Sequence, residues 1–366
     1  MKRIILAIGS SEIGGAQKVF LSIVTELTKN GVDVIVVLPP GPLVEALKKI
    51  IVVKIYIVSY NLISIFKIYK IIKENNIYLI NSFLTKCSFI FVVANYFNQV
   101  PICCTLLNAI TNEKLNSLQK KIYPILYRII QKLSDGIIVN SYQNKKHFVD
   151  VGCMDNNAID VIYSGVETPS LIPMNKQSEI KKNKLVIGTI GRLSSEKGHK
   201  YLLEALKYIE DIEFECWIVG DGPLRKDLEE YVVYSGLTGK VKFWGFRDDV
   251  SIILQNIDIV VVPSLDETFG LSIIEAFMHK KIVVATNVGG IPEIVQNMVT
   301  GLLVSPRDGK GLAEMIRLCV NDQKSVGFMV DSAFALASEK FTTDSMNKRF
   351  IMYYQKLQDR KGFKVF

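Results

Sequence analysis

The residues best suited to chemistry in this sequence lie in a stretch with two carboxylates, Glu267 and Glu275, eight positions apart. A β-type run at 257–262 precedes the stretch, Gly270 lies in a turn, and an apolar helical run follows at 272–278. A strand, a glycine turn and a helix direct backbone N–H groups toward an anion, and carboxylates accept hydrogen bonds from hydroxyl groups. The pattern predicts a pocket for a ligand with phosphates and hydroxyls, such as a sugar nucleotide. The alternative is that Glu267 only caps the dipole of its own helix.

Two cations, Arg192 and Lys197, follow another expected strand at 185–190, with a glycine on either side at 191 and 198. A guanidinium and an ammonium that converge there would neutralise a pyrophosphate and stabilise it as a leaving group. The alternative for Lys197 is an ordinary solvated loop side chain. Together with the Glu267 stretch, the pattern favours phosphate binding.

Glycine turns follow several other expected strands. Gly14 and Gly15 follow the first strand and could let the backbone approach a phosphate, because glycine has no Cβ. The full Gly-x-Gly-x-x-Gly spacing is absent, which argues against a nicotinamide cofactor. Gly222 lies in a turn that could approach the nucleotide or be a plain turn. Gly245 and its aromatic neighbours, Phe246 among them, could border a base or fill core.

A chain of 366 residues suggests two domains, because a single core rarely grows beyond about 250–300 residues. Val/Ile-rich runs alternate with helical segments, which predicts two doubly wound α/β domains with parallel sheets that face each other across a cleft. Ligands of such sheets bind at the carboxyl ends of the strands. We expect a first domain at 1–168, a Pro- and Lys-containing linker at 169–183, a second domain at 184–344 and a final helix at 345–366. The expected strands are 4–8, 32–38, 52–58, 77–81, 102–106, 136–140, 159–163, 185–190, 214–219, 241–244, 257–262, 282–286 and 302–304.

The net charge of +8 is concentrated in the first half of the chain. Residues 1–170 hold 18 Lys/Arg against 11 Asp/Glu, and residues 171–366 hold 26 against 25. A basic, apolar half without a run of about 20 apolar residues fits attachment to an anionic membrane surface. No nucleic-acid-binding motif is evident. The expected helix 62–74 carries Lys67, Lys70 and Lys73, and could lie on a membrane or be an ordinary sheet-covering helix with a solvated Lys stripe.

The cysteines and the first residues of the chain argue against a cysteine-bound metal site and a secreted protein. The six cysteines lack metal-ligand spacing, and we expect them to be reduced. The chain begins in an expected strand rather than in a signal peptide. We therefore expect a cytoplasmic protein that is peripheral on the inner face of the cell membrane.

The motifs together resemble glycosyltransferase family 4, whose members are retaining enzymes of the GT-B fold. The resemblance spans nearly the whole chain and is strongest over 184–305. The matching motifs are Gly14-Gly15, Gly191-Arg192, Glu196-Lys197-Gly198, Gly220-Asp221-Gly222-Pro223, the Glu267 and Glu275 pair, Gly289-Gly290-Ile291-Pro292-Glu293 and Gly301-Leu302-Leu303-Val304.

The resemblance implies that the second domain holds most of a nucleotide-diphospho-sugar donor. It implies that Arg192 and Lys197 bind the pyrophosphate, that Glu275 binds the ribose hydroxyls, and that Gly15 meets the phosphates from across the cleft. It places Glu267 and the backbone of 269–271, which is Phe269, Gly270 and Leu271, near the donor sugar and phosphate. The expected catalytic residues are Glu267, Arg192 and Lys197. The tail helix is expected to return to the first domain.

One feature departs from the family. Many relatives carry a His after a first-domain strand, whereas the corresponding strands here end in Asn81-Ser82 and Leu107-Asn108. Asn108 or Asn81 could bind a sugar hydroxyl of the acceptor instead. No Asp-x-Asp motif is present, so we expect no obligatory metal and no cofactor, with Arg192 and Lys197 supplying the charge that Mg²⁺ supplies elsewhere.

The sequence thus predicts transfer of a hexosyl group, with retention, from a UDP-sugar rather than GDP-mannose. The expected acceptor is a lipid-linked or membrane-bound saccharide, as in the synthesis of capsule or another surface polysaccharide. The alternatives are a weak or inactive sugar-nucleotide-binding subunit, a sugar-nucleotide 2-epimerase and a soluble glycogen-type transferase.

Overall fold

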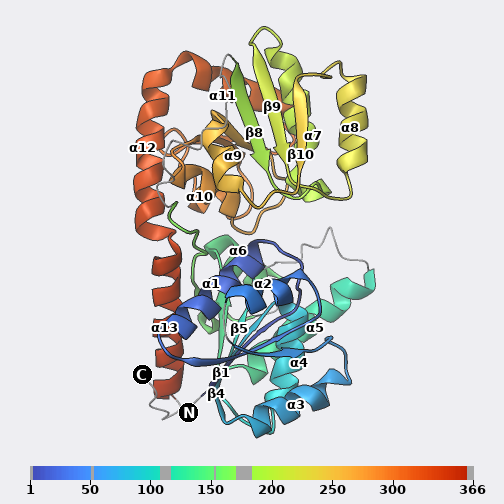
Figure 1. Ribbon diagram of the computed structural model, residues 1–366, viewed down its shortest axis with the longest axis vertical. Helices are drawn as coiled ribbons and strands as arrows, with labels where there is room; N and C mark the ends of the chain where they lie inside the picture. Colours follow the sequence, from blue (N-terminus) through green and yellow to red (C-terminus); the bar gives the residue numbers. More distant parts are fainter. Residues whose placement is uncertain (1–2, 51–52, 108–116, 152–153, 170–183, 361–366) are drawn as a thin grey trace. The chain divides into compact units, whose positions relative to one another are not determined.

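The computed structural model describes residues 3–50, 53–107, 117–151, 154–169 and 184–360 (Figure 1). The chain forms two compact units, and each contains one parallel sheet. Unit 1 is Met1–Ser164 with Thr343–Phe366, and unit 2 is Gly165–Thr342. The predicted α/β class with two parallel sheets is confirmed. The boundary at 164/165 precedes the expected linker, of which 170–183 lies outside the described residues.

The sheet of unit 1 has seven strands in the order β3-β2-β1-β4-β5-β6-β7, and neighbouring strands pair in parallel. Its strands are β1 Arg3–Ile8, β2 Asp33–Leu38, β3 Lys54–Ile57, β4 Ile77–Phe83, β5 Ile102–Thr105, β6 Gly136–Val139 and β7 Ile159–Val161. Its helices are α1 Gly15–Lys29, α2 Pro42–Ile50, α3 Ser64–Glu74, α4 Thr85–Asn95, α5 Ser117–Leu133, α6 Tyr142–Asp150 and α13 Thr343–Arg360.

Both faces of this sheet are covered, because successive side chains of a strand point to opposite sides. Ile5 of β1 belongs to a buried cluster that includes Ile68 of α3, whereas Ile4 belongs to a second cluster that includes Phe20 of α1 and Phe350 of α13. Burial on both sides explains why the strands read as dense Val/Ile runs.

The tail helix α13 is joined to the sheet of unit 1 by a buried hydrogen bond. The Nδ2 atom of Asn81 donates to the hydroxyl of Tyr354 at 2.7 Å, and the hydroxyl of Thr105 donates to Oδ1 of Asn81 at 2.8 Å. Asn81 is fully buried. The expectation that Asn81 binds a sugar hydroxyl is therefore wrong, because its amide is committed to holding α13 and cannot reach solvent.

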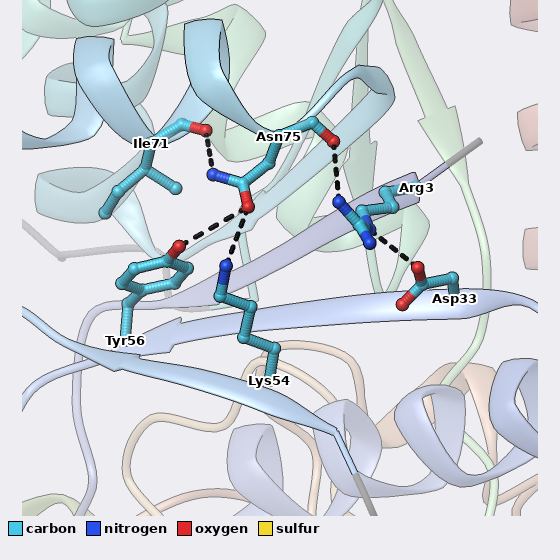
Figure 2. Close-up of polar contacts among 6 residues, drawn as sticks. All are labelled: Arg3, Asp33, Lys54, Tyr56, Ile71 and Asn75. Carbon is cyan, nitrogen blue, oxygen red and sulfur yellow. Dashed lines mark hydrogen bonds and ion pairs between the residues drawn. The ribbon is translucent and has the colours of Figure 1, made fainter. Parts of the chain in front are cut away.

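The carboxyl end of helix α3 is held at the amino edge of the same sheet (Figure 2). Asn75 ends α3, and its Nδ2 donates to the carbonyl of Ile71 at 2.8 Å. Its Oδ1 accepts from Nζ of Lys54 at 2.9 Å and from the hydroxyl of Tyr56 at 3.4 Å. Arg3, paired with Asp33 at 2.6 Å, also donates to the backbone oxygen of Asn75 at 3.5 Å. One side chain thus ends the helix and fixes it to the edge strand β3.

The sheet of unit 2 has six parallel strands in the order β10-β9-β8-β11-β12-β13. Its strands are β8 Leu185–Ile190, β9 Phe214–Val219, β10 Val241–Gly245, β11 Ile259–Val262, β12 Ile282–Thr286 and β13 Leu302–Val304. Its main helices are α7 His199–Leu206, α8 Arg225–Tyr234, α9 Val250–Asn256, α10 Leu271–Met278, α11 Gly309–Asn321 and α12 Gln323–Lys340.

The strand order of unit 2 reverses between β8 and β11. The chain leaves β8 toward β9 and β10, and later leaves β11 in the opposite direction toward β12 and β13. The loops that follow β8 and β11 therefore diverge at the carboxyl edge of the sheet, which is where open α/β sheets bind their ligands.

Candidate functional site

The two loops at this reversal point carry the residues that the sequence singles out. Lys197 ends the short helix η4 (Ser195–Lys197) after β8, and Glu267 lies in the loop between β11 and α10. The Nζ atom of Lys197 lies 2.6 Å from Oε2 of Glu267, with the two side chains 28% and 12% exposed. The structure thus joins a cation and a carboxylate that are 70 residues apart in sequence.

The backbone around this ion pair is packed so tightly that side chains are excluded. The amide of Leu265 donates to the carbonyl of Glu196 at 2.7 Å. Gly198 has a φ of +64°, and a Cβ on it would lie 2.0 Å from the carbonyl oxygen of Pro263. Only glycine permits this approach, so the glycine after Lys197 sets the distance between the two loops.

Two further glycines, Gly289 and Gly290, pack against the backbone of Glu267. The amide of Gly290 donates to the carbonyl of Glu267 at 2.9 Å. Gly289 has a φ of +53°, and a Cβ there would lie 1.8 Å from that same oxygen. The backbone of Gly289 and Gly290 therefore fixes the position of the Glu267 backbone.

Helix α10 follows Glu267 and carries Glu275. Gly270 precedes the helix with a φ of +115°, and Leu271 is its first residue. The ring of Phe269 is buried and packs edge-on against Phe341 with ring centroids 5.7 Å apart, so only the backbone of Phe269 can serve a ligand. Glu275 lies one turn beyond Leu271 and is partly buried. The amino end of α10, beside Glu267, is electrostatically suited to an anion.

Arg192 lies in the loop directly after β8 and is exposed. Within the part of the chain that the structure describes, no acidic group pairs with its guanidinium, in contrast to Lys197. The loop itself is fixed, because the amide of Leu193 donates to the carbonyl of Asp221 at 3.0 Å. A Cβ on Gly222 would lie 2.5 Å from the carbonyl oxygen of Leu193, and one on Gly220 would lie 1.9 Å from that of Gly191. The glycines of the turn after β9 thus bring that turn against the Arg192 loop.

Phe246 follows β10 at the same edge of the sheet and is 64% exposed. Its neighbours are restrained, because the carbonyl of Gly245 accepts from the amide of Gly220 at 2.8 Å and Arg247 is paired with Asp249 at 2.7 Å. The structure therefore presents an exposed aromatic ring on a fixed backbone, which is suited to stacking against a flat group.

His199 is a residue of this region that the sequence analysis missed. It is the first residue of α7 and is buried, and its Nδ1 has no hydrogen-bond partner in the described structure. Burial, with a smaller contribution from the charge of Lys197, lowers the pKa of His199 to about 4, while the charge of Glu196 opposes the shift. An uncharged imidazole therefore lies behind the Lys197 loop at neutral pH. In the sequence, the position of His199 directly after Lys197 and Gly198 could have indicated that it lies near the site.

The remaining predicted residues do not join this group within unit 2. Gly14 and Gly15 lie in unit 1, where Gly14 precedes α1 and Gly15 is its first residue, so Gly15 belongs to the helix rather than to a turn. Asn108 lies outside the described residues. Across the described ranges, no three His, Cys, Asp or Glu side chains gather as metal ligands. Independence from a metal stays a prediction.

Unit 2 thus combines an exposed guanidinium, a Lys–Glu pair and the amino end of a helix at one reversal point. Two cations and a helix dipole can stabilise a diphosphate, and two carboxylates can accept hydrogen bonds from sugar hydroxyls. Such a set of groups suits the binding of a nucleotide-linked sugar.

The family models agree with this geometry. A model described as Glycosyltransferase Family 4 matches residues 13–169, and one described as Glycosyl transferases group 1 matches residues 173–333. Together with the two parallel-sheet units, these matches identify the protein as a glycosyltransferase of the GT-B fold. The chain belongs to the family 4 type, as the sequence motifs predict.

Three similar proteins illustrate this relationship. A 41.2 kDa protein in the cps region of Klebsiella pneumoniae is 30% identical over 248 residues, which are 65% of this chain and 66% of that protein. The Escherichia coli UDP-Gal:alpha-D-GlcNAc-diphosphoundecaprenol alpha-1,3-galactosyltransferase is 26% identical over 263 residues, 67% of each chain. The crystal structure of Anabaena HepE in complex with UDP and glucose has a TM-score of 0.85 at 24% identity, and covers 96% of this chain and 98% of that one. The matched stretch thus spans about two thirds of each of the two curated relatives.

Proposed function

We propose that the protein transfers a hexosyl group from a nucleotide-diphospho-sugar, a UDP-sugar rather than GDP-mannose, to a lipid-linked or membrane-bound saccharide. The observation that carries the proposal is the 2.6 Å contact between Lys197 and Glu267 at the reversal point of the sheet in unit 2. It joins the loop that carries Arg192 to the loop that leads into α10, so that one ligand can contact both.

In this proposal Arg192 and Lys197 bind the pyrophosphate, and Glu275 accepts hydrogen bonds from the ribose hydroxyls. Glu267 and the backbone of 269–271 contact the donor sugar and the phosphate next to it. Breaking the bond between the anomeric carbon and the phosphate oxygen places negative charge on the leaving diphosphate, which the two cations stabilise. Because this stabilisation needs no metal, we expect activity without Mg²⁺.

Retention of configuration requires the acceptor hydroxyl to attack from the face that the diphosphate leaves. Its oxygen bonds to the anomeric carbon as the bond to the phosphate oxygen breaks, and its proton passes to that departing oxygen. Such a step depends chiefly on a stabilised leaving group and a positioned acceptor. The chain supplies the first through Arg192 and Lys197, so the missing first-domain His does not by itself prevent catalysis.

A UDP-sugar donor is supported by the UDP and glucose complex of HepE and by the UDP-Gal specificity in the name of the Escherichia coli relative. The name of that relative also describes a lipid-linked acceptor, and the Klebsiella relative lies in a cps region. These names support surface polysaccharide synthesis, capsule included. We propose that the transfer takes place at the inner face of the cell membrane. Within the described residues, no helix is long and apolar enough to cross a bilayer.

A thermal-shift screen with UDP-, GDP- and ADP-sugars tests the donor, because a ligand that binds only the folded state raises the melting temperature. Transfer is then measured by product formation with a lipid-linked saccharide, and the anomeric configuration of the product is read by NMR. UDP-sugar binding without transfer or hydrolysis would indicate an inactive binding subunit. Conversion of the donor to its 2-epimer would indicate an epimerase.

A further inference from the structure

Three large apolar side chains are exposed side by side at the start of α3. Leu62, Ile63 and Phe66 are 73%, 81% and 76% exposed. Single exposed apolar residues are ordinary on protein surfaces, but three within five positions form a patch. We call these three residues the α3 apolar patch.

The patch is not a poorly packed part of the core. Helix α3 has a separate buried face formed by Ile68, Ile71 and Ile72, which pack in the core of unit 1. With 3.6 residues per turn, Ile63 and Phe66 point nearly opposite to that face. The helix therefore has one apolar face in the core and a second one in solvent.

Both ends of α3 are fixed. At its start the amide of Ser64 donates to Oδ1 of Asn61 at 3.0 Å, and the amide of Asn61 donates to the hydroxyl of Ser64 at 3.1 Å. At its end Asn75 is bonded to the strands of the sheet (Figure 2). The α3 apolar patch is thus presented on a rigid support.

A row of lysines continues the exposed face beyond the patch. Lys67, Lys70 and Lys73 are exposed. Lys67 lies one turn after Ile63, and Lys70 and Lys73 lie one and two turns after Phe66, so the three lysines continue the exposed side of the helix. Lys67 also donates to the carbonyl of Ile57 at 3.1 Å, which holds its charge next to the patch. An apolar wedge followed by a row of cations is complementary to a bilayer surface with anionic headgroups.

We propose that the α3 apolar patch inserts into the headgroup region of an anionic lipid bilayer, with Lys67, Lys70 and Lys73 contacting the lipid phosphates. The patch follows β3, so it lies at the carboxyl edge of the sheet, the edge that also carries Gly14 and Gly15. The inference rests on the proposed function in one respect. A saccharide attached to a lipid of that bilayer would lie close to the edge of unit 1 that carries Gly14 and Gly15.

The test is co-flotation of the full chain with vesicles of phosphatidylcholine, with or without phosphatidylglycerol. We expect binding only to the anionic vesicles, weakening as salt rises. Combined Leu62→Ser, Ile63→Ser and Phe66→Ser should lower partitioning at least about tenfold. The matched control removes three exposed apolar side chains elsewhere, Tyr234→Ser, Phe328→Ser and Met352→Ser, and should bind as the wild type does.

A second set of variants tests the charges. Combined Lys67→Gln, Lys70→Gln and Lys73→Gln should weaken binding about a hundredfold at low salt and flatten its salt dependence. Removal of three exposed lysines of unit 2, Lys226→Gln, Lys310→Gln and Lys324→Gln, should have a much smaller effect.

UDP-induced thermal shifts of the same preparations separate the possible failures. A wild type that binds UDP but ignores anionic vesicles would overturn the docking surface and leave the donor site standing. A wild type that binds vesicles without binding any sugar nucleotide would refute the proposed function only. If the serine variant instead converts a dimer to a monomer in sedimentation, the patch is an interface between two copies of the chain and the inference is wrong.

Discussion

Substitution of Gly289 tests whether its backbone holds Glu267 in place. In Gly289→Ala the added Cβ would lie 1.8 Å from the carbonyl oxygen of Glu267, at a φ of +53°. The close atom belongs to the backbone, so no change of side-chain rotamer can relieve the overlap. Either Gly289 or the loop that carries Glu267 must move.

Two costs add in this variant. An alanine with left-handed φ costs about 1–2 kcal/mol, and a steric overlap in a packed interior costs about 1–3 kcal/mol more. Gly236→Ala isolates the first cost, because Gly236 has a φ of +69° and nothing lies within 4 Å of its added Cβ. The free energy of unfolding should therefore fall about 1–3 kcal/mol further in Gly289→Ala than in Gly236→Ala. Displacement of Glu267 by about 1 Å should also lower turnover about a hundredfold.

Tryptophan fluorescence reports the relevant unit alone. Both tryptophans of the chain, Trp217 and Trp244, lie in unit 2 with ring centroids 5.0 Å apart. Urea unfolding followed by this signal therefore measures unit 2, and donor hydrolysis measures turnover. Equal destabilisation of the two alanine variants, with turnover preserved in both, would show that Gly289 does not position Glu267.

Three further predictions concern separate parts of the molecule. Glu275→Ala should weaken UDP binding, whereas Lys197→Ala should lower turnover more than binding; equal, small effects in calorimetry and kinetics would refute these roles. His199 has a folded pKa of about 4 against about 6.5 unfolded, so the unfolded state binds more protons and stability falls with falling pH. The free energy of unfolding of unit 2 should fall by about 2 kcal/mol between pH 7 and pH 5, and this fall should be smaller in His199→Gln but not in His147→Gln. The same pH dependence in His199→Gln as in the wild type would contradict this prediction. Tyr354→Phe removes the acceptor of a buried amide and should destabilise unit 1 by about 1–3 kcal/mol in circular dichroism, and no loss would show that the bond is dispensable.

The fold was predictable because its signals are local. Dense Val/Ile runs and the glycine turns that follow them indicate buried parallel strands, and the structure places strands over 185–190, 214–219 and 282–286 as expected. The alternation of strands and helices then limits the topology to doubly wound sheets. The first residue of a helix is harder to predict from sequence than the helix itself. Gly15, which the sequence placed in a glycine turn, is the first residue of α1.

The side-chain partners were not predictable in the same way. The bond between Lys197 and Glu267 joins positions 70 residues apart, and no local pattern indicates it. The partner of Asn81 was equally unpredictable, because only the packing of Tyr354 against the sheet shows that the Asn81 amide already has a hydrogen-bond partner. The sequence of α3 shows apolar residues on more than one side of the helix. Only the orientation of the helix on the sheet shows that Ile68 is buried and Phe66 is exposed.

The proposed function requires the cations after β8 to bind the diphosphate of the donor. Calorimetric titration of the wild type and of Arg192→Ala with UDP and with uridine tests it directly, because the two ligands differ only in the diphosphate. The wild type should bind UDP far more tightly than uridine, and Arg192→Ala should lose most of that preference. Equal binding of UDP and uridine by the wild type, or a preference untouched by Arg192→Ala, would contradict it.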